Sequence, residues 1–132
     1  MSQENVATAK RIYDARNRGD VDAVIEECDP DVEWRPHLAS LSGRPIRGRE
    51  EVREYLTSLQ EDWESFRHEP ERFMEVGDKV VVFLHAHARG RGSGVDVDVP
   101  VAHVLSFEQG RCSEFVSYYD RAEALKSARL DE

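Results

Sequence analysis

The clearest alternation of apolar and polar positions runs through residues 95–107. The odd-numbered side chains there form one face at the two-residue period of a β-strand, and that face is apolar except at His103. Gly110 suits a tight turn, after which residues 112–119 alternate again. The pattern predicts a long β-hairpin whose apolar face carries a single histidine.

Helical spacing of apolar residues predicts three helices in the first half of the chain, over residues 5–17, 21–28 and 49–64. The third has the most regular apolar stripe, which includes Tyr55. Pro30 ends the second helix, because proline disfavours helix in the preceding residue and cannot donate a backbone hydrogen bond.

Strand patterns cover much of the remaining sequence. They predict a short strand over residues 32–37, a surface loop over 39–47, and strands over 66–76 and 79–89 joined by a Gly77-Asp78 turn. The resulting order is helix, helix, strand, helix and four strands in two hairpins. It predicts an α+β domain with helices on one face of a curved antiparallel sheet.

Composition limits the class of protein. A chain of 132 residues that is 39% hydrophobic predicts one domain, over residues 1–132. The net charge of −9 argues against a nucleic-acid or anionic-membrane partner. With no membrane-length apolar run and no signal-peptide pattern, we expect a cytoplasmic protein. Cys28 and Cys112 have no paired spacing, which favours reduced thiols.

Four ordered motifs carry a resemblance that spans nearly the whole chain. They are Tyr13-x-Ala-x-Asn-x-Gly-Asp20, Asp29-Pro-Asp-Val-Glu-Trp34, Ile46-Arg-Gly-Arg-Glu-Glu-Val52 and Ala102-His-Val-Leu-Ser-Phe-Glu-Gln-Gly-Arg111. Together they resemble the SnoaL-like branch of the nuclear transport factor two-like superfamily. The resemblance implies a cone-shaped fold, in which a curved antiparallel sheet wraps around helices and encloses a pocket, commonly in a homodimer packed through the sheet.

Members of this superfamily include polyketide cyclases, ketosteroid isomerases, dehydratases and epoxide hydrolases, so the fold alone does not choose a function. By the resemblance, the isomerase's oxyanion tyrosine falls at Ile12, which leaves Tyr13 one residue away and turned to another face. The general-base aspartate falls at Trp34, and the buried carboxylic acid falls at His103. These departures argue against a standard steroid isomerase. An imidazole at the acid/base position keeps cyclase-like or isomerase-like proton transfer open.

The strand over residues 80–88 is apolar on both faces, which supports the expected homodimer through the sheet. Its even-numbered side chains form the more continuous apolar face and suit the pocket side. His85 and His87 then lie on the other face, at an interface or in solvent. Together with His103 they could offer three imidazoles to a metal, but no carboxylate stands at ligand spacing, so we expect no metal site.

The sequence therefore suggests a protein that binds a small hydrophobic or cyclic molecule without a cofactor, with His103 as the candidate catalytic acid/base. The side chains expected to shape the pocket are Trp34, Tyr55, Val101, Leu105, Phe115, Ser117 and Tyr119. Two alternatives remain open: a non-catalytic small-molecule binding protein, and a dimeric accessory module. His103 could equally be a hydrogen-bonded core histidine, and the large aromatic residues could equally be core.

Overall fold

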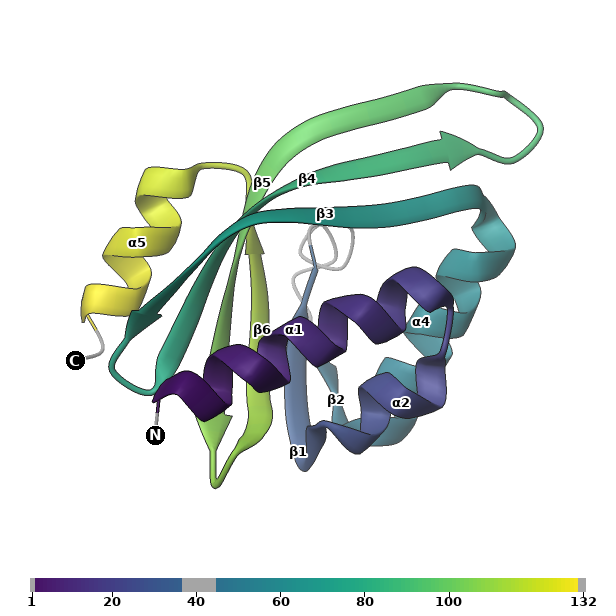
Figure 1. The fold of residues 1–132 in the computed structure, drawn as a ribbon. Coiled ribbons are helices and arrows are strands. Elements are labelled where there is room, and N and C mark those ends of the chain that lie inside the picture. The colour runs from purple at the N-terminus through teal and green to yellow at the C-terminus, as the bar shows by residue number, and fades with distance from the viewer. Residues whose placement is uncertain (1, 37–44, 131–132) are drawn as a thin grey trace.

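The computed structural model describes residues 2–36 and 45–130 (Figure 1). Its elements are α1 (Ser2–Arg18), α2 (Val21–Glu26), β1 (Cys28–Arg35), β2 (Ile46–Arg47), α4 (Gly48–Asp62), β3 (Trp63–Val76), β4 (Lys79–Gly90), β5 (Asp96–Glu108), β6 (Arg111–Tyr118) and α5 (Arg121–Leu130). The predicted end of a strand at His37 and most of the predicted loop over 39–47 lie outside the described residues. None of the described helices has the length and apolar character needed to cross a bilayer.

Six strands form one curved sheet in the order β2-β1-β6-β5-β4-β3. The predicted α+β class with a curved sheet is confirmed. One pair differs from the prediction: β1 runs parallel to β6, whereas every other neighbouring pair is antiparallel. The sheet is therefore mixed. A strand's own residues show its period but not the direction of its neighbour, so the sequence pattern could not reveal this.

Alternation along the central strands divides the core into two clusters. Val80, Val82 and Leu84 of β4 lie on the concave face and pack with buried residues of α1, α2 and α4. Figure 1 shows the sheet curving around α1, with α2 and α4 beside it. The even-numbered face of this strand was predicted to point toward the pocket side, and these three side chains are fully buried there.

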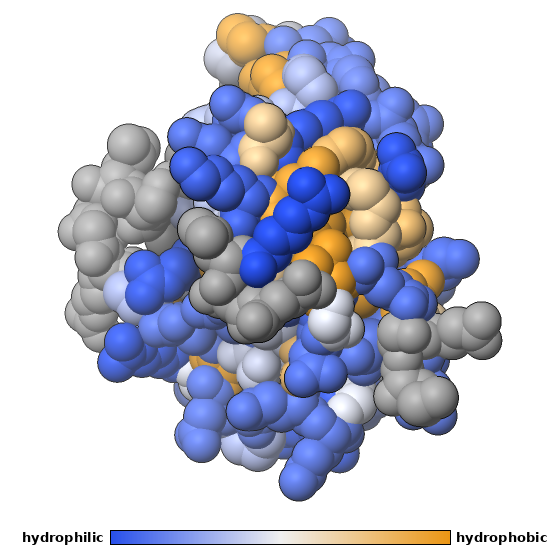
Figure 2. Space-filling view, turned by 90° about the vertical axis from the view of Figure 1, so that its left-hand side faces the viewer, coloured by the Kyte–Doolittle hydropathy of each residue, from blue (hydrophilic) through white to orange (hydrophobic). Residues whose placement is uncertain are grey.

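Helix α5 was not predicted, and it covers the opposite face of the sheet. Ala124 and Ala128 pack there against Val81, Ala102 and Val104. The apolar outer side of β4, which suggested a homodimer, is thus covered in part by the same chain. Figure 2 shows that hydrophilic residues make up most of the side that carries α5, with apolar residues gathered near the middle of the view. Dimerisation stays a prediction.

The second helix is shorter than predicted. Asp20 caps α2 as expected, with its carboxylate accepting from the backbone N–H of Ala23 at 3.1 Å. The helix ends at Glu26, before Pro30, because the carbonyl of Glu27 accepts a hydrogen bond from the N–H of Cys112 at 2.9 Å. Pairing with β6 therefore begins where the pattern still predicted helix. The same pairing makes Cys28 the register partner of Cys112, and both thiols are buried and free.

We expect Ala124→Asp to lower the free energy of unfolding by about 3 kcal/mol, because it buries a carboxylate between α5 and the sheet. Ala124 is fully buried against apolar side chains. Urea unfolding measures the change. Ala122→Asp is the matched control, since it places the same side chain at an exposed position of α5. Equal stability of the two variants would show that α5 does not pack as described.

Candidate functional site

A cavity of about 270 Å³ lies between the concave face of the sheet and the helices. Strands β3 to β6 contribute most of its wall, which also includes Trp34 of β1, Arg16 of α1 and Tyr55 of α4. Apolar and aromatic side chains predominate, and none of the described residues that line the cavity is acidic. Small-molecule sites in proteins share this character, with a few polar groups placed in a largely apolar wall.

The imidazole of His103 lies on this wall, near the middle of β5, and is 3% exposed. The hydroxyl of Tyr13 lies 2.6 Å from its Nδ1, and the planes of the two rings are nearly parallel, at 2°. Burial raises the pKa of Tyr13 well above its usual value, although the nearby Arg16 opposes this effect. The phenol is therefore neutral near pH 7, and the bond fixes the orientation of the imidazole.

His68 of β3 forms the next part of the wall. Its ring meets that of His103 edge-on at 5.1 Å between centroids. Asn17 fixes the strand here, since its side-chain nitrogen donates to the carbonyl of His68 at 2.7 Å and its oxygen accepts from the His68 N–H at 2.8 Å. Burial, followed by electrostatic interactions with Arg16 and with the imidazole of His103, lowers the pKa of His68 well below its usual value. His68 is therefore neutral near pH 7.

An aromatic pair lies beside His103. Trp34 and Phe115, register partners on β1 and β6, stack at 4.1 Å between centroids with an interplanar angle of 4°. The guanidinium carbon of Arg16 lies 5.6 Å from each of the two ring centroids, within the range of a cation–π interaction. The parallel pairing of β1 with β6 thus brings two stacked aromatic rings together beside a cation.

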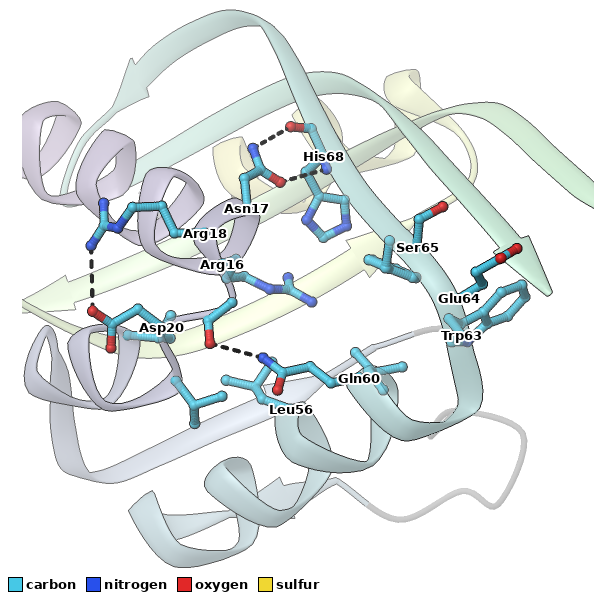
Figure 3. A pocket seen from close by; sticks show the side chains of 15 residues that line it. Arg16, Asn17, Arg18, Asp20, Leu56, Gln60, Trp63, Glu64, Ser65 and His68 are labelled. Atoms are coloured by element: carbon cyan, nitrogen blue, oxygen red, sulfur yellow. Dashed lines mark hydrogen bonds and ion pairs between the residues drawn. The ribbon is translucent and has the colours of Figure 1, made fainter. Parts of the chain in front are cut away.

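A second cavity of about 390 Å³ adjoins the first, at the end of α1 and between α4 and the start of β3. The two cavities share Arg16, Trp63, Phe66 and His68. Figure 3 shows Arg16 extending from α1 into this space, away from the Arg18–Asp20 ion pair. Arg16 therefore stands where the two cavities meet.

The structure brings most of the predicted site residues together. Lining the first cavity are His103, Trp34, Tyr55, Val101, Phe115, Ser117 and Tyr119. Tyr119 is 70% exposed and stands at the rim. Leu105 departs from the prediction: it shares the face of His103 but is fully buried in the core and does not line the cavity. The roles of these residues in binding or catalysis stay predictions.

Sequence reasoning missed three contributors to the site: Tyr13, Arg16 and His68. Tyr13 was expected to turn to another face, but it is 2% exposed and points at His103. Consecutive helix positions lie only about 100° apart, so Ile12 and Tyr13 both reach the wide face that the curved sheet encloses. The helical spacing that included Tyr13 was the available signal. No comparable pattern in the sequence indicates Arg16 or His68.

The three imidazoles that could have shared a metal do not converge. His85 and His87 lie on the outer face of the sheet, where both are within ion-pair distance of Asp98, at 2.9 Å and 3.4 Å. His103 lies on the concave face. Within residues 2–36 and 45–130, no group of three or more His, Cys, Asp or Glu side chains is placed to hold a metal ion.

Comparison with known protein families decides where this chain belongs. Residues 9–115 match the model of the SnoaL-like domain. The chain is a member of the SnoaL-like family. The match includes α1 from Ala9 onward with Tyr13, the whole of β5 with His103, and β6 as far as Phe115. No protein with a curated description matches this SnoaL-like chain.

Solved structures agree with the family. An NTF2-like protein of unknown function from Burkholderia pseudomallei K96243 is 28% identical to this SnoaL-like protein, with a TM-score of 0.79 over 93% of this chain and 95% of that one. A putative SnoaL-like polyketide cyclase from Jannaschia sp. CCS1 is 22% identical, with a TM-score of 0.79 over 97% and 93%. TerC, co-crystallised with polyporic acid, is 21% identical, with a TM-score of 0.77 over 95% and 98%.

We expect Tyr13→Phe to lower the free energy of unfolding by about 1–3 kcal/mol, because it takes the phenol away from a buried imidazole nitrogen. Urea unfolding measures the loss. Tyr118→Phe is the control, since it removes a half-buried hydroxyl that donates to Ser127 at 2.7 Å on the outer face. A loss no larger than that of the control would argue against a tight Tyr13–His103 bond.

We expect His68 to make this SnoaL-like protein less stable in acid. Below about pH 6.5 the unfolded chain protonates this residue while the folded protein does not, so stability falls as the pH drops, by up to about 1.4 kcal/mol per pH unit. His68→Phe keeps a ring in place and should flatten this loss. Urea unfolding between about pH 7 and pH 5 measures it.

His85→Gln is the control for this pH dependence. The hydrogen bond with Asp98 raises the pKa of the exposed His85, so its contribution has the opposite sign and is lost as the pH rises. Removing His85 therefore cannot flatten the loss in acid. If the free energy of unfolding of His68→Phe falls between pH 7 and pH 5 as steeply as that of the wild type, His68 is not held neutral.

Proposed function

We propose that this SnoaL-like protein binds a small hydrophobic cyclic molecule in the first cavity and transfers a proton on it, in a cyclase-type or isomerase-type reaction with His103 as acid/base. One observation carries the proposal: a buried imidazole on the wall of an apolar cavity is held at 2.6 Å by a buried, neutral tyrosine. Such a group combines a fixed orientation with the ability to give and take a proton near neutral pH.

Tyr13 would set the state of the imidazole. When Nδ1 of the neutral ring donates to the phenol oxygen, Nε2 carries a lone pair and can take a proton from the substrate as a base. The ring is then an imidazolium, which still donates from Nδ1 to the neutral phenol and can return the Nε2 proton to the enolate as an acid. One residue can therefore serve both halves of an enolisation, and neither tyrosinate nor imidazolate is formed.

The remaining wall suits a flat substrate. The stacked rings of Trp34 and Phe115 offer an aromatic surface next to His103, whose ring centroid lies 4.4 Å from that of Phe115. Ser117 and the hydroxyl of Tyr55 add polar groups to the wall. The co-crystal of TerC with polyporic acid supports a cyclic ligand, and the Jannaschia protein's description as a putative polyketide cyclase supports the reaction type.

The test is exchange of the proton beside a carbonyl group for solvent deuterium, measured by mass spectrometry over a panel of cyclic ketones and polyketide-type intermediates. With a substrate found, we expect His103→Gln to slow exchange by about 10²–10⁴-fold, because it removes the only proposed acid/base. Its affinity for the substrate should change by less than about threefold, since the cavity wall is kept.

His85→Gln serves as the matched control, because it makes the same replacement on the outer face of the sheet, away from the cavity. It should exchange at the wild-type rate. If His103→Gln also exchanges at the wild-type rate, His103 is not the acid/base. Ligands that bind without any exchange would favour the alternative function, a non-catalytic small-molecule binding protein.

A further inference from the structure

Arg16 differs from the other arginines of α1 because its side chain does not pair with a carboxylate of the described residues. Arg11 contacts the carboxylate of Glu27 at 2.7 Å, and Arg18 contacts Asp14 and Asp20, all at the surface. Arg16 instead points inward, and within the described parts of the chain it has neither an ion-pair partner nor a hydrogen-bond acceptor. Its guanidinium instead makes cation–π contacts with the rings of Trp34 and Phe115.

Arg16 is half-buried, so its guanidinium has lost part of its water, and this group cannot lose its proton in a protein. Burial lowers the pKa of Arg16, which reports this loss of water. Two ring faces at 5.6 Å offset only part of it, since they satisfy none of the five N–H donors. The side chain therefore presents N–H donors at the junction of the two cavities that meet no acceptor among the described residues.

The charges around the first cavity indicate the sign of charge that a ligand there should have. The chain has 27 acidic residues and a net charge of −9, yet none of the described residues that line the first cavity is acidic. Arg16 is the one permanently charged side chain among them. His68, beside it, is kept neutral. The indole N–H of Trp34 is a further buried donor with no acceptor in the described part of the chain.

We propose that the ligand of this cavity is an organic anion: a flat, ring-containing molecule whose carboxylate or enolate oxygens accept hydrogen bonds from the guanidinium of Arg16. Its ring lies against Trp34 and Phe115, with His103 at its other side. The proposal rests on the binding function proposed above and adds the charge of the ligand to it. A planar guanidinium matches such oxyanions because it can donate two parallel hydrogen bonds.

The test compares two probes of the same shape, cinnamate and its neutral amide cinnamamide, by isothermal titration calorimetry. The wild-type protein should bind cinnamate about tenfold more tightly or better, because a charge-assisted bidentate contact replaces a neutral one. Arg16→Met should abolish this preference while binding cinnamamide within about threefold of wild type. Arg16→Lys should keep part of the preference, since it keeps the charge without the planar fork.

Arg11→Met is the control on the same helix, where the arginine is exposed and paired with Glu27; it should keep the wild-type preference. Arg16→Met without a probe should melt no lower than the wild type, because it removes a desolvated cation. A large drop in melting temperature would instead assign Arg16 a structural role and overturn the proposal.

The outcomes separate this proposal from the one it rests on. If the wild type binds both probes equally, or if Arg16→Met keeps the preference for cinnamate, the anionic ligand is wrong while the binding cavity stands. If the wild type binds neither probe, the binding function fails and the proposal fails with it. Preference for the anion that is lost only in the Arg16 variants supports both.

Discussion

The hydrogen bond between Tyr13 and His103 joins the first helix to the middle of the sheet, and both side chains are buried. A buried imidazole without a partner would destabilise the fold, and a buried phenol would do the same, so each satisfies the other. The contact also sets the distance at which α1 lies above β5. Arg16 follows Tyr13 by three residues on the same helix, so this contact places the cation at the cavity as well.

The surface of the molecule and its first cavity differ in the sign of their charge. The surface is acidic, and many of its arginines are paired with carboxylates, as Arg11, Arg18 and Arg53 are. The first cavity contains neutral aromatic, aliphatic and hydroxyl groups with one cation among its described residues. Water is a poor competitor in such a place, so a single charge there acts over a longer range and with more effect than the same charge at the surface.

Short-range patterns in the sequence were sufficient to predict most of the helices and strands. Alternation identified β4, β5 and β6 and placed His103 on the concave face, and helical spacing identified α1 and α4. These patterns work because one face of each element is buried. Helix α5 was not predicted because its buried side consists of small residues, Ala124 and Ala128, and alanine gives a weak hydrophobic signal.

The remaining features depend on which distant segments meet. The parallel pairing of β1 with β6 decided where α2 ends and brought Trp34 against Phe115. The contact of Tyr13 with His103 and the inward turn of Arg16 depend on how the sheet curves around α1. No local pattern contains that information, because the direction and register of a strand are properties of its neighbour.

The parallel pair also bears on the order in which the molecule can be assembled during synthesis. β3, β4 and β5 pair with strands adjacent in the sequence. β1 has only the two-residue strand β2 as such a neighbour, and its longer pairing must wait for β6. Contacts of such high sequence separation close slowly, because loop entropy is lost before they are made. A nascent chain that lacks β6 can already contain α1, α2, α4 and the strands β3, β4 and β5, yet it lacks Phe115, the ring on which Trp34 stacks.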